Sequence, residues 1–334
     1  MENIQKNDII ELSIIIPVYN CSQYLKEGFE KLKYLYSTNI TFEILYVNDG
    51  STDNSLEVLN EIEENNTFVK VISQENQGSS GARNTAIEVA QGKYIQFLDA
   101  DDNLDFEQLL LLLQVAINNS LDAISYRLDY INENNVKIGE RPKQTVTFNQ
   151  IISGSQALIE GFNPSSICVF LFKTDFLNKN NLRITPKITH MDVEFTSRMM
   201  LVTNRIMFVD FILYHYLQRE GSITKPKTID KFKQIIYDEI IIATNIRKTL
   251  EQQFSNELKI AIQKNYNAVV WNILWRFLNK QNEVDLDFKL KCIDELKKRN
   301  LYPIKGALKT NFQILTSIFF NFFWLYKLFV KNKK

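Results

Sequence analysis

Apolar and polar positions along the first hundred residues predict strands and helices in alternation. Strand-like runs, apolar almost without interruption, occupy residues 12–18, 42–47, 68–72 and 94–98. Runs of this kind are typical of strands buried on both faces of a parallel sheet. The stretches between them carry apolar residues at helical spacing, in residues 21–36, 56–62 and 82–90. Repeated strand–helix–strand units predict an α/β fold with right-handed crossovers and a mainly parallel central sheet.

The pattern changes twice further along the chain. Beyond residue 113 it predicts shorter strands at 123–130, 146–148, 167–172 and 206–216, with a helix at 193–201. From about residue 230 it predicts long helices at 232–250, 257–278 and 288–299. We place a domain boundary at 222–228. The expected division is an α/β domain at 1–225 (halves 1–104 and 105–225), a helical region at 226–304 and a tail at 305–334.

Composition excludes several classes of protein. The chain has 334 residues with 39 basic and 39 acidic side chains, and this balance argues against binding nucleic acid through overall charge. Its cysteines, Cys21, Cys168 and Cys292, form no C-x-x-C pair, which argues against a disulfide framework or a structural zinc site. The charged N-terminus, residues 1–11, lacks an apolar core, so we expect no signal peptide and a cytoplasmic location.

Polar clusters follow the four strands of the first half. They are residues 19–20, 48–53, 74–84 and 99–103. Because ligands of open α/β sheets bind beyond the carboxyl ends of the strands, these clusters are expected to form one site.

The acidic run Asp99, Asp101 and Asp102 is the most specific of these signals. Carboxylates suit Mg²⁺ or Mn²⁺, and such an ion would neutralise charge on a diphosphate leaving group. The alternative is a capping role at the start of the next helix. Residues 78–84 are interpreted as a flexible loop entering a helix, which offers N–H groups and Arg83 to phosphate; the dinucleotide-binding glycine spacing is absent.

Four segments together resemble the family 2 inverting glycosyltransferases of the GT-A fold. They are Ser13-Ile-Ile-Ile-Pro-Val-Tyr-Asn20, Val47-Asn-Asp-Gly-Ser-Thr-Asp53, Glu75-Asn-Gln-Gly-Ser-Ser-Gly-Ala-Arg-Asn84 and Phe97-Leu-Asp-Ala-Asp-Asp102. The resemblance covers residues 12–222, in the family's order and spacing. It implies a GT-A fold followed by a C-terminal helical region.

The resemblance also implies a donor site for a nucleotide-sugar, most naturally a UDP-sugar. The implied donor-binding residues are Pro17, Tyr19, Asn20, Asp49, Gly50, Ser51, Arg83, Asp99, Ala100, Asp101, Arg219 and Ser222. Within them, Tyr19 would pack beside the base and Asp49 would bond the uracil edge. Asp101, with Asp102 sharing the task, would hold Mn²⁺ or Mg²⁺ on the diphosphate.

The family's general base lies in a Glu-Asp pair that opens a helix. Here Asp192 matches the aspartate, whereas Met191 replaces the glutamate. Asp192 is therefore the expected base and Glu194 the second choice, with a helix N-cap as the structural alternative. His190 is interpreted as an ordinary packing or surface residue, although it lies close to Asp192.

Residues 312–330 form an aromatic-rich segment with lysines on both sides. This composition favours an in-plane anchor on an anionic membrane surface. Packing on the protein itself or on a partner subunit, and a membrane-spanning helix, are the alternatives.

The sequence thus predicts a metal-dependent inverting glycosyltransferase of polysaccharide biosynthesis on the inner face of a bacterial membrane. Its acceptor would be a hydroxyl of a saccharide or lipid-linked oligosaccharide, and oligomers are possible. The rivals are a degenerate donor-binding scaffold and a nucleotidyltransferase, which would need a Gly-rich basic loop after the first strand.

Overall fold

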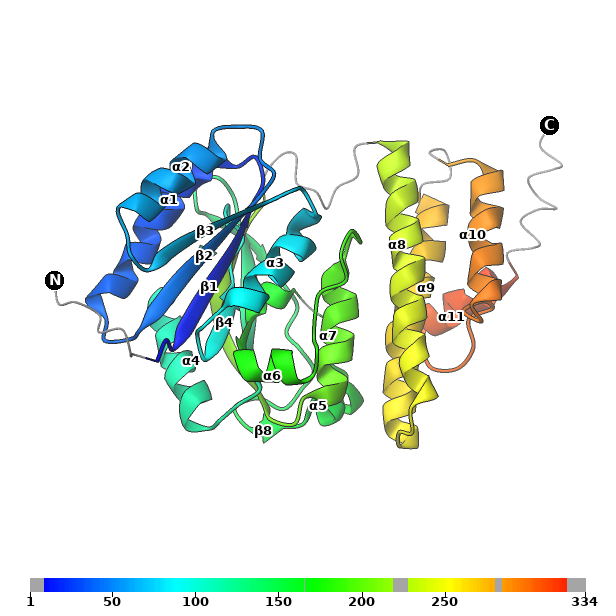
Figure 1. The fold of residues 1–334 in the computed structure, drawn as a ribbon. Coiled ribbons are helices and arrows are strands. Elements are labelled where there is room, and N and C mark those ends of the chain that lie inside the picture. Colours follow the sequence, from blue (N-terminus) through cyan, green and yellow to red (C-terminus); the bar gives the residue numbers. More distant parts are fainter. Residues whose placement is uncertain (1–8, 165, 219–227, 280–283, 323–334) are drawn as a thin grey trace. The chain divides into compact units, whose positions relative to one another are not determined.

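The computed structural model describes residues 9–164, 166–218, 228–279 and 284–322. Its described strands form one ten-stranded sheet in the order β3-β2-β1-β4-β9-β6-β10-β5, with β7 beside β6 and β8 beside β10 (Figure 1). The strands are β1 (Leu12–Val18), β2 (Phe42–Asp49), β3 (Val69–Gln74), β4 (Tyr94–Phe97), β5 (Asn103–Leu104), β6 (Ala123–Ile131), β7 (Lys137–Glu140), β8 (Ile151–Ile152), β9 (Phe170–Lys173) and β10 (Ile206–Leu217).

Helices and loops connect these strands, and helices predominate in the last third of the described chain. They are α1 (Ser22–Leu32), α2 (Ser55–Glu64), α3 (Gly78–Val89), α4 (Phe106–Asn118), α5 (Gly154–Glu160), α6 (Thr174–Lys179), α7 (Met191–Val202), α8 (Ile229–Lys248), α9 (Asn256–Asn279), α10 (Leu286–Lys298) and α11 (Asn311–Asn321). Short 3₁₀ helices are η1 (Lys33–Ser37), η2 (Ile167–Val169) and η3 (Thr249–Glu251).

The first four strands form the parallel sheet that the apolar runs predict. β1 pairs in parallel with both β2 and β4, and β2 pairs in parallel with β3. Right-handed crossovers then place α1 and α2 on one face of this part of the sheet and α3 on the other (Figure 1). The chain reverses its direction of travel across the sheet between β1 and β4. Ligands of open sheets bind at such a switch point, beside the carboxyl ends of the strands.

The second half of the sheet differs from the predicted one. β9 enters between β4 and β6 and runs antiparallel to both. The predicted strand at 146–148 is wrong, because these residues form no strand and β8 lies at 151–152 instead. Residues 167–169 turn as η2, where the Ser166 hydroxyl accepts a hydrogen bond from the Cys168 N–H over 3.2 Å. The loop predicted at 78–84 is also wrong, since α3 already begins at Gly78.

Aromatic side chains pack in the core between β4 and β9, two strands that are distant in the sequence. Phe97, Phe170 and Phe172 are fully buried, and the Phe172 ring lies 5.8 Å from Phe97 and 5.4 Å from Phe170. The three cysteines are buried and form no disulfide among the described residues. This packing fixes the end of β4, from which the acidic segment emerges.

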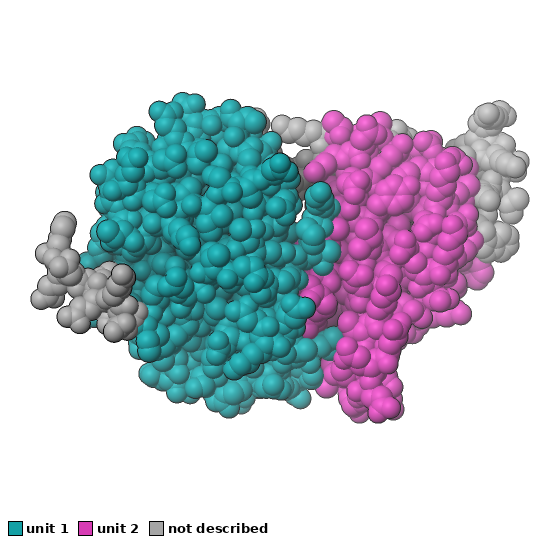
Figure 2. Space-filling model, in the orientation of Figure 1, with its two compact units in different colours: residues 1–157, 165–187, 199–222 teal, residues 158–164, 188–198, 223–334 magenta. Residues whose placement is uncertain are grey.

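The chain divides into two compact units, which Figure 2 shows in separate colours. Unit 1 comprises residues 1–157, 165–187 and 199–222, and unit 2 comprises residues 158–164, 188–198 and 223–334. Unit 1 contains the sheet, and unit 2 contains α8 to α11. The boundary predicted at 222–228 lies, except for residue 228, outside the described residues.

Within unit 2, α11 packs one face on α9 and leaves the other exposed. Phe320 is fully buried, and the Trp271 indole N–H donates to the Thr316 hydroxyl over 2.8 Å. On the other face, Leu315 and Phe319 remain 69% and 60% exposed. No helix among the described residues is long and apolar enough to cross a membrane. Residues 323–330 of the predicted anchor lie outside the described residues.

Candidate active site

Hydrogen bonds join the loops that follow β1 and β2. Asn20 adopts a left-handed conformation with φ of 49°, and its side-chain oxygen accepts a hydrogen bond from the Thr52 N–H over 2.7 Å. In return, the Asn20 N–H donates to the Ser51 hydroxyl over 3.1 Å. Tyr19, just before this link, is 52% exposed, and an exposed aromatic ring can stack on a flat ligand such as a base. The structure thus brings Asn20 and Ser51 together, with Tyr19 next to Asn20 in the chain.

Asp49 links the end of β2 to the loop after β3. Its carboxylate is buried, and its Oδ1 accepts hydrogen bonds from the Gln74 side chain over 2.7 Å and from the Gln77 N–H over 2.8 Å. Gly50 follows with φ of 72°, and a Cβ there would lie only 3.0 Å from the Asn76 nitrogen. The tight turn therefore requires glycine, and it holds Asp49 at the strand end.

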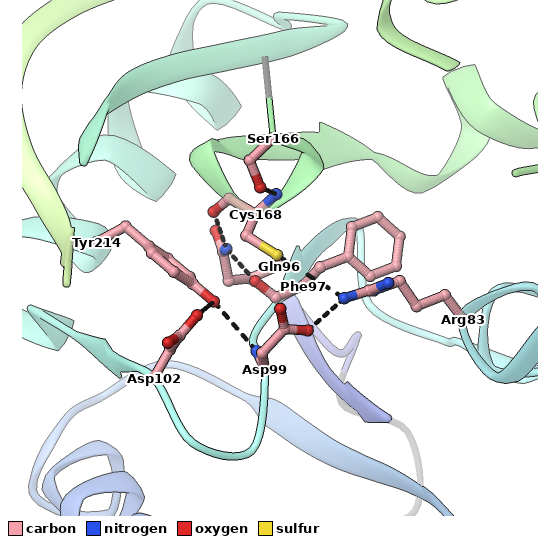
Figure 3. Close-up of polar contacts among 8 residues, drawn as sticks. All are labelled: Arg83, Gln96, Phe97, Asp99, Asp102, Ser166, Cys168 and Tyr214. Carbon is pink, nitrogen blue, oxygen red and sulfur yellow. Dashed lines mark hydrogen bonds and ion pairs between the residues drawn. The ribbon is translucent and has the colours of Figure 1, made fainter. Parts of the chain in front are cut away.

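Arg83 reaches from α3 to the acidic segment. The side chain is buried, and its guanidinium forms an ion pair with the Asp99 carboxylate (Figure 3). Its Nη2 also lies 4.0 Å from the Cys168 sulfur. Asp99 itself remains one-third exposed, at 33% of its side chain. The pair therefore joins the third and fourth strand-end clusters, with one carboxylate reachable from solvent.

Asp102 is buried and its carboxylate is bonded by β10. The Tyr214 hydroxyl donates to Oδ2 over 2.6 Å (Figure 3). The Leu217 N–H donates to Oδ1 over 2.8 Å. Burial raises the pKa of Asp102 well above its usual value, with further contributions from Asp99 and Asp101, and these two hydrogen bonds oppose that rise. The same environment raises the pKa of Tyr214, chiefly by burial. Asp102 therefore fixes the acidic segment against β10.

Asp101 is the remaining acid of the segment, and it is half-buried. No group of three or more His, Cys, Asp or Glu side chains arranged for a metal occurs among the described residues. A site with only one or two carboxylates still suits Mg²⁺ or Mn²⁺ bound together with a diphosphate. Such ions complete their coordination shell with phosphate oxygens and water. The donor set of the Asp99–Asp102 segment consists of hard carboxylate oxygens, which fits those ions.

The predicted base and its alternative have different surroundings. Asp192 lies half-buried in the first turn of α7, within unit 2. Glu194 is buried, and its two oxygens accept hydrogen bonds from Arg198 Nε over 2.6 Å and Nη2 over 3.0 Å. Both Glu194 oxygens are thus engaged by one guanidinium on the same helix, which gives Glu194 a structural role within α7.

Two predicted contacts, Arg219 and Ser222, lie outside the described residues. Other residues of the site were missed by the sequence reasoning. Tyr214 lies in the mostly apolar strand β10, where a tyrosine gives no signal of a polar role. Gln74 and Gln77 fall in a polar cluster, but nothing in their spacing indicates that they bond Asp49.

Comparison with known proteins gives concordant results. A family model described as Glycosyl transferase family 2 matches residues 13–175. An uncharacterized glycosyltransferase of Haemophilus influenzae is 31% identical over 189 residues, 55% of this chain and 69% of that protein. The uncharacterized glycosyltransferase YibD of Escherichia coli K12 is 30% identical over 224 residues, so that the match spans 66% of this chain but only 64% of YibD.

The fold matches a solved structure as well. Staphylococcus aureus TarS 1–349 in complex with UDP-GlcNAc superposes with a TM-score of 0.66 at 21% identity, over 87% of this chain and 80% of that one. The mixed α/β sheet and the C-terminal helical region are therefore those of a GT-A glycosyltransferase, as predicted. With four strand-end motifs in one linked cluster, the chain belongs to glycosyl transferase family 2.

Proposed function

We propose that this glycosyltransferase moves a sugar from a UDP-sugar to a hydroxyl of a saccharide or lipid-linked oligosaccharide, with inversion at the anomeric carbon and a divalent metal at Asp101. The family match favours sugar transfer over both a scaffold and a nucleotidyltransferase. A uridine nucleotide is supported by the name of the TarS complex, which contains UDP-GlcNAc.

The observation that carries the proposal is the linkage of four strand ends into one polar surface. Asn20 joins the first two ends, Asp49 joins the second and third, and the Arg83–Asp99 pair joins the third and fourth. A nucleotide-sugar needs a stacking face, a hydrogen-bonding partner for its base and ribose, and a metal ligand for its diphosphate. Tyr19 would offer the stacking face, Asp49 and Asp99 the hydrogen-bonding groups, and Asp101 the metal ligand, and all four lie at or just after the ends of the neighbouring strands β2, β1 and β4.

The metal would be held by Asp101, with the Asp102 carboxylate behind it fixing the segment. When bound, Mn²⁺ or Mg²⁺ would neutralise the charge that develops on the leaving diphosphate. Because Asp102 already accepts two hydrogen bonds from Tyr214 and Leu217, we assign the direct contact to Asp101.

Asp192 would supply the general base. Its carboxylate takes the proton of the acceptor hydroxyl while the oxygen attacks the anomeric carbon. The bond from that carbon to the diphosphate oxygen breaks with its electron pair, which leaves with the nucleoside diphosphate. One direct displacement inverts the anomeric carbon and requires no covalent intermediate.

We also propose that α11 lies on an anionic membrane surface at the inner face of the cell membrane. Its outward face carries Leu315, Ile318 and Phe319, each more than half exposed, and Phe312 beside them is also more than half exposed although its ring packs on Trp271 and Trp275. Apolar area of this kind gains free energy when it enters the headgroup region, and the lysines that follow in the sequence would add attraction to anionic lipids.

Donor use can be tested by nucleoside-diphosphate release from a panel of nucleotide-sugars, with Mn²⁺, with Mg²⁺ and with EDTA. We expect release from a UDP-sugar, its loss in EDTA and its loss in Asp101→Ala. Asp175→Ala serves as the matched control, because Asp175 is an exposed acid of the same unit with a surface ion pair to Lys179. Full activity in EDTA would overturn the metal assignment, and release from no nucleotide-sugar would overturn the donor class.

A further inference from the structure

Two successive acids of α8, Asp238 and Glu239, are buried in unit 2 with 1% and 4% of their surface exposed. Burying a carboxylate is costly unless partners compensate for the lost water. Both acids find partners in the short segment that precedes α7, and that segment leads directly to Asp192.

Asp238 holds the main chain of this segment. Its Oδ2 accepts a hydrogen bond from the Thr189 N–H over 2.8 Å, and its Oδ1 accepts one from the Gln234 side chain over 2.7 Å. Because the donor at Thr189 is a backbone group, this bond fixes the path of the chain and not merely a side-chain rotamer.

Glu239 holds the next residue. Its Oε1 lies 3.4 Å from His190 Nδ1 and 3.0 Å from Arg276 Nη2. Its Oε2 is buried and has no hydrogen-bond partner among the described residues. An unsatisfied buried oxygen lowers stability, so folding alone does not account for a glutamate at this position.

The segment between these contacts is sharply bent. His190 has φ of 60°, a left-handed conformation that is unfavourable for a residue with a Cβ. Its carbonyl oxygen accepts a hydrogen bond from the Val193 N–H over 3.1 Å and so closes the first turn of α7 around Asp192. The direction of that turn therefore depends on where Thr189 and His190 are held.

We propose that Asp238 and Glu239 are positioning residues that aim the Asp192 carboxylate through the Thr189–His190 segment. The inference rests on the proposed role of Asp192 as the general base. The helical region would then contribute to catalysis, because α8 would supply the contacts that hold the base in a fixed position.

The test compares Asp238→Ala, Asp238→Asn and Glu239→Gln, with Asp230→Asn as the control from an exposed position of the same helix. We expect kcat for transfer to fall about 10- to 100-fold in Asp238→Ala, the effect of misplacing a catalytic group by about 1 Å. KM for the donor should stay within about twofold. Asp238→Asn should recover most of the loss, because its amide oxygen still accepts from the Thr189 N–H. Glu239→Gln should lower kcat about 10-fold or more, because Glu239 faces Arg276 and His190 and a neutral amide loses the charge that attracts them.

Combining the variants with Asp192→Asn separates positioning from other effects. If Asp238 acts through Asp192, Asp238→Ala should lower the residual activity of Asp192→Asn by less than about twofold, because the group it aims is gone. If the kcat losses of Asp238→Ala and Asp192→Asn multiply in the double variant, the inference is overturned and the base assignment stands. Wild-type kcat in folded Asp238→Ala and Glu239→Gln would have the same consequence. Wild-type activity in Asp192→Asn would instead overturn the base assignment, and the inference with it.

Discussion

The Tyr214 hydroxyl donates a 2.6 Å hydrogen bond to the buried carboxylate of Asp102, and so joins the end of β10 to the acidic segment after β4. The same hydroxyl accepts the Asp99 N–H over 3.2 Å. One phenol thus contacts both ends of the segment that carries Asp101.

Replacing Tyr214 with Phe would remove the hydroxyl and keep the ring. We expect a loss of about 1–3 kcal/mol in the free energy of unfolding, because a buried carboxylate and a backbone N–H each lose a partner. Transfer should fall together with metal affinity, since the segment is no longer held. Urea unfolding and metal titration of activity measure the two effects. Tyr130→Phe, at a half-buried position of β6, is the control and should change neither.

Replacing Asp192 with Asn should lower kcat for transfer by about 10²- to 10⁴-fold, the usual contribution of a general base. KM for the donor should change little, because the carboxylate is assigned to the acceptor. Glu194→Gln should mainly lower stability by weakening the paired hydrogen bonds to Arg198. Steady-state kinetics on both variants decide the assignment, and a larger kcat loss in Glu194→Gln would reverse our choice.

The exposed face of α11 can be changed without opening its buried face. Leu315→Asp combined with Phe319→Asp should leave thermal stability and transfer to a soluble acceptor unchanged. Binding to anionic vesicles should weaken about 100-fold or more, because burial of two large apolar side chains is lost. Vesicle sedimentation at low and high salt measures this, and Leu111→Asp, an exposed apolar position in α4, is the control. Unchanged vesicle binding would exclude α11 as the contact.

The lowered pKa of Asp53 should make the stability of the fold depend on pH in the acid range. Burial acts to raise its pKa, but hydrogen bonds from Ser55 and Ser22 outweigh it and lower the pKa from 3.8 to about 2. A carboxyl with a lowered folded-state pKa stabilises the fold above its unfolded pKa and loses that effect as pH falls through the folded value. The Tm difference between wild type and Asp53→Asn should therefore be full above about pH 4 and shrink towards pH 2. Parallel Tm curves would contradict this account.

The parallel half of the sheet could be predicted because each of its strands is marked by a short apolar run in the sequence. An almost uninterrupted apolar run such as 12–18 is typical of a strand covered on both faces, and the polar residues after it then lie at the sheet edge. The place of β9 could not be predicted in this way. It depends on Phe172 packing against Phe97, which is distant in the sequence, and against Phe170 of its own strand.

The roles of single polar residues were predicted less well than their positions. Asp102 has the sequence context of a metal ligand, yet its bonds to Tyr214 and Leu217 come from a strand more than a hundred residues away. Asp238 lies on a helix, where an acid ordinarily indicates the solvated face. Only the folded chain shows that it is 1% exposed and bonded to the Thr189 backbone.

Because the chain passes several times between the two units, a chimera of two related proteins cannot exchange one unit with a single splice. The chain passes from one unit to the other after residues 157, 164, 187, 198 and 222, so α7 contributes to both. A chimera spliced once near residue 225 would combine residues 158–164 and 188–198 of one parent with the helical region of another. The Asn163–Lys309 and Thr189–Asp238 contacts would then join residues of different ancestry. A donor-binding cassette exchanged between relatives would therefore have to carry matching changes in α8 and in the residues around 309.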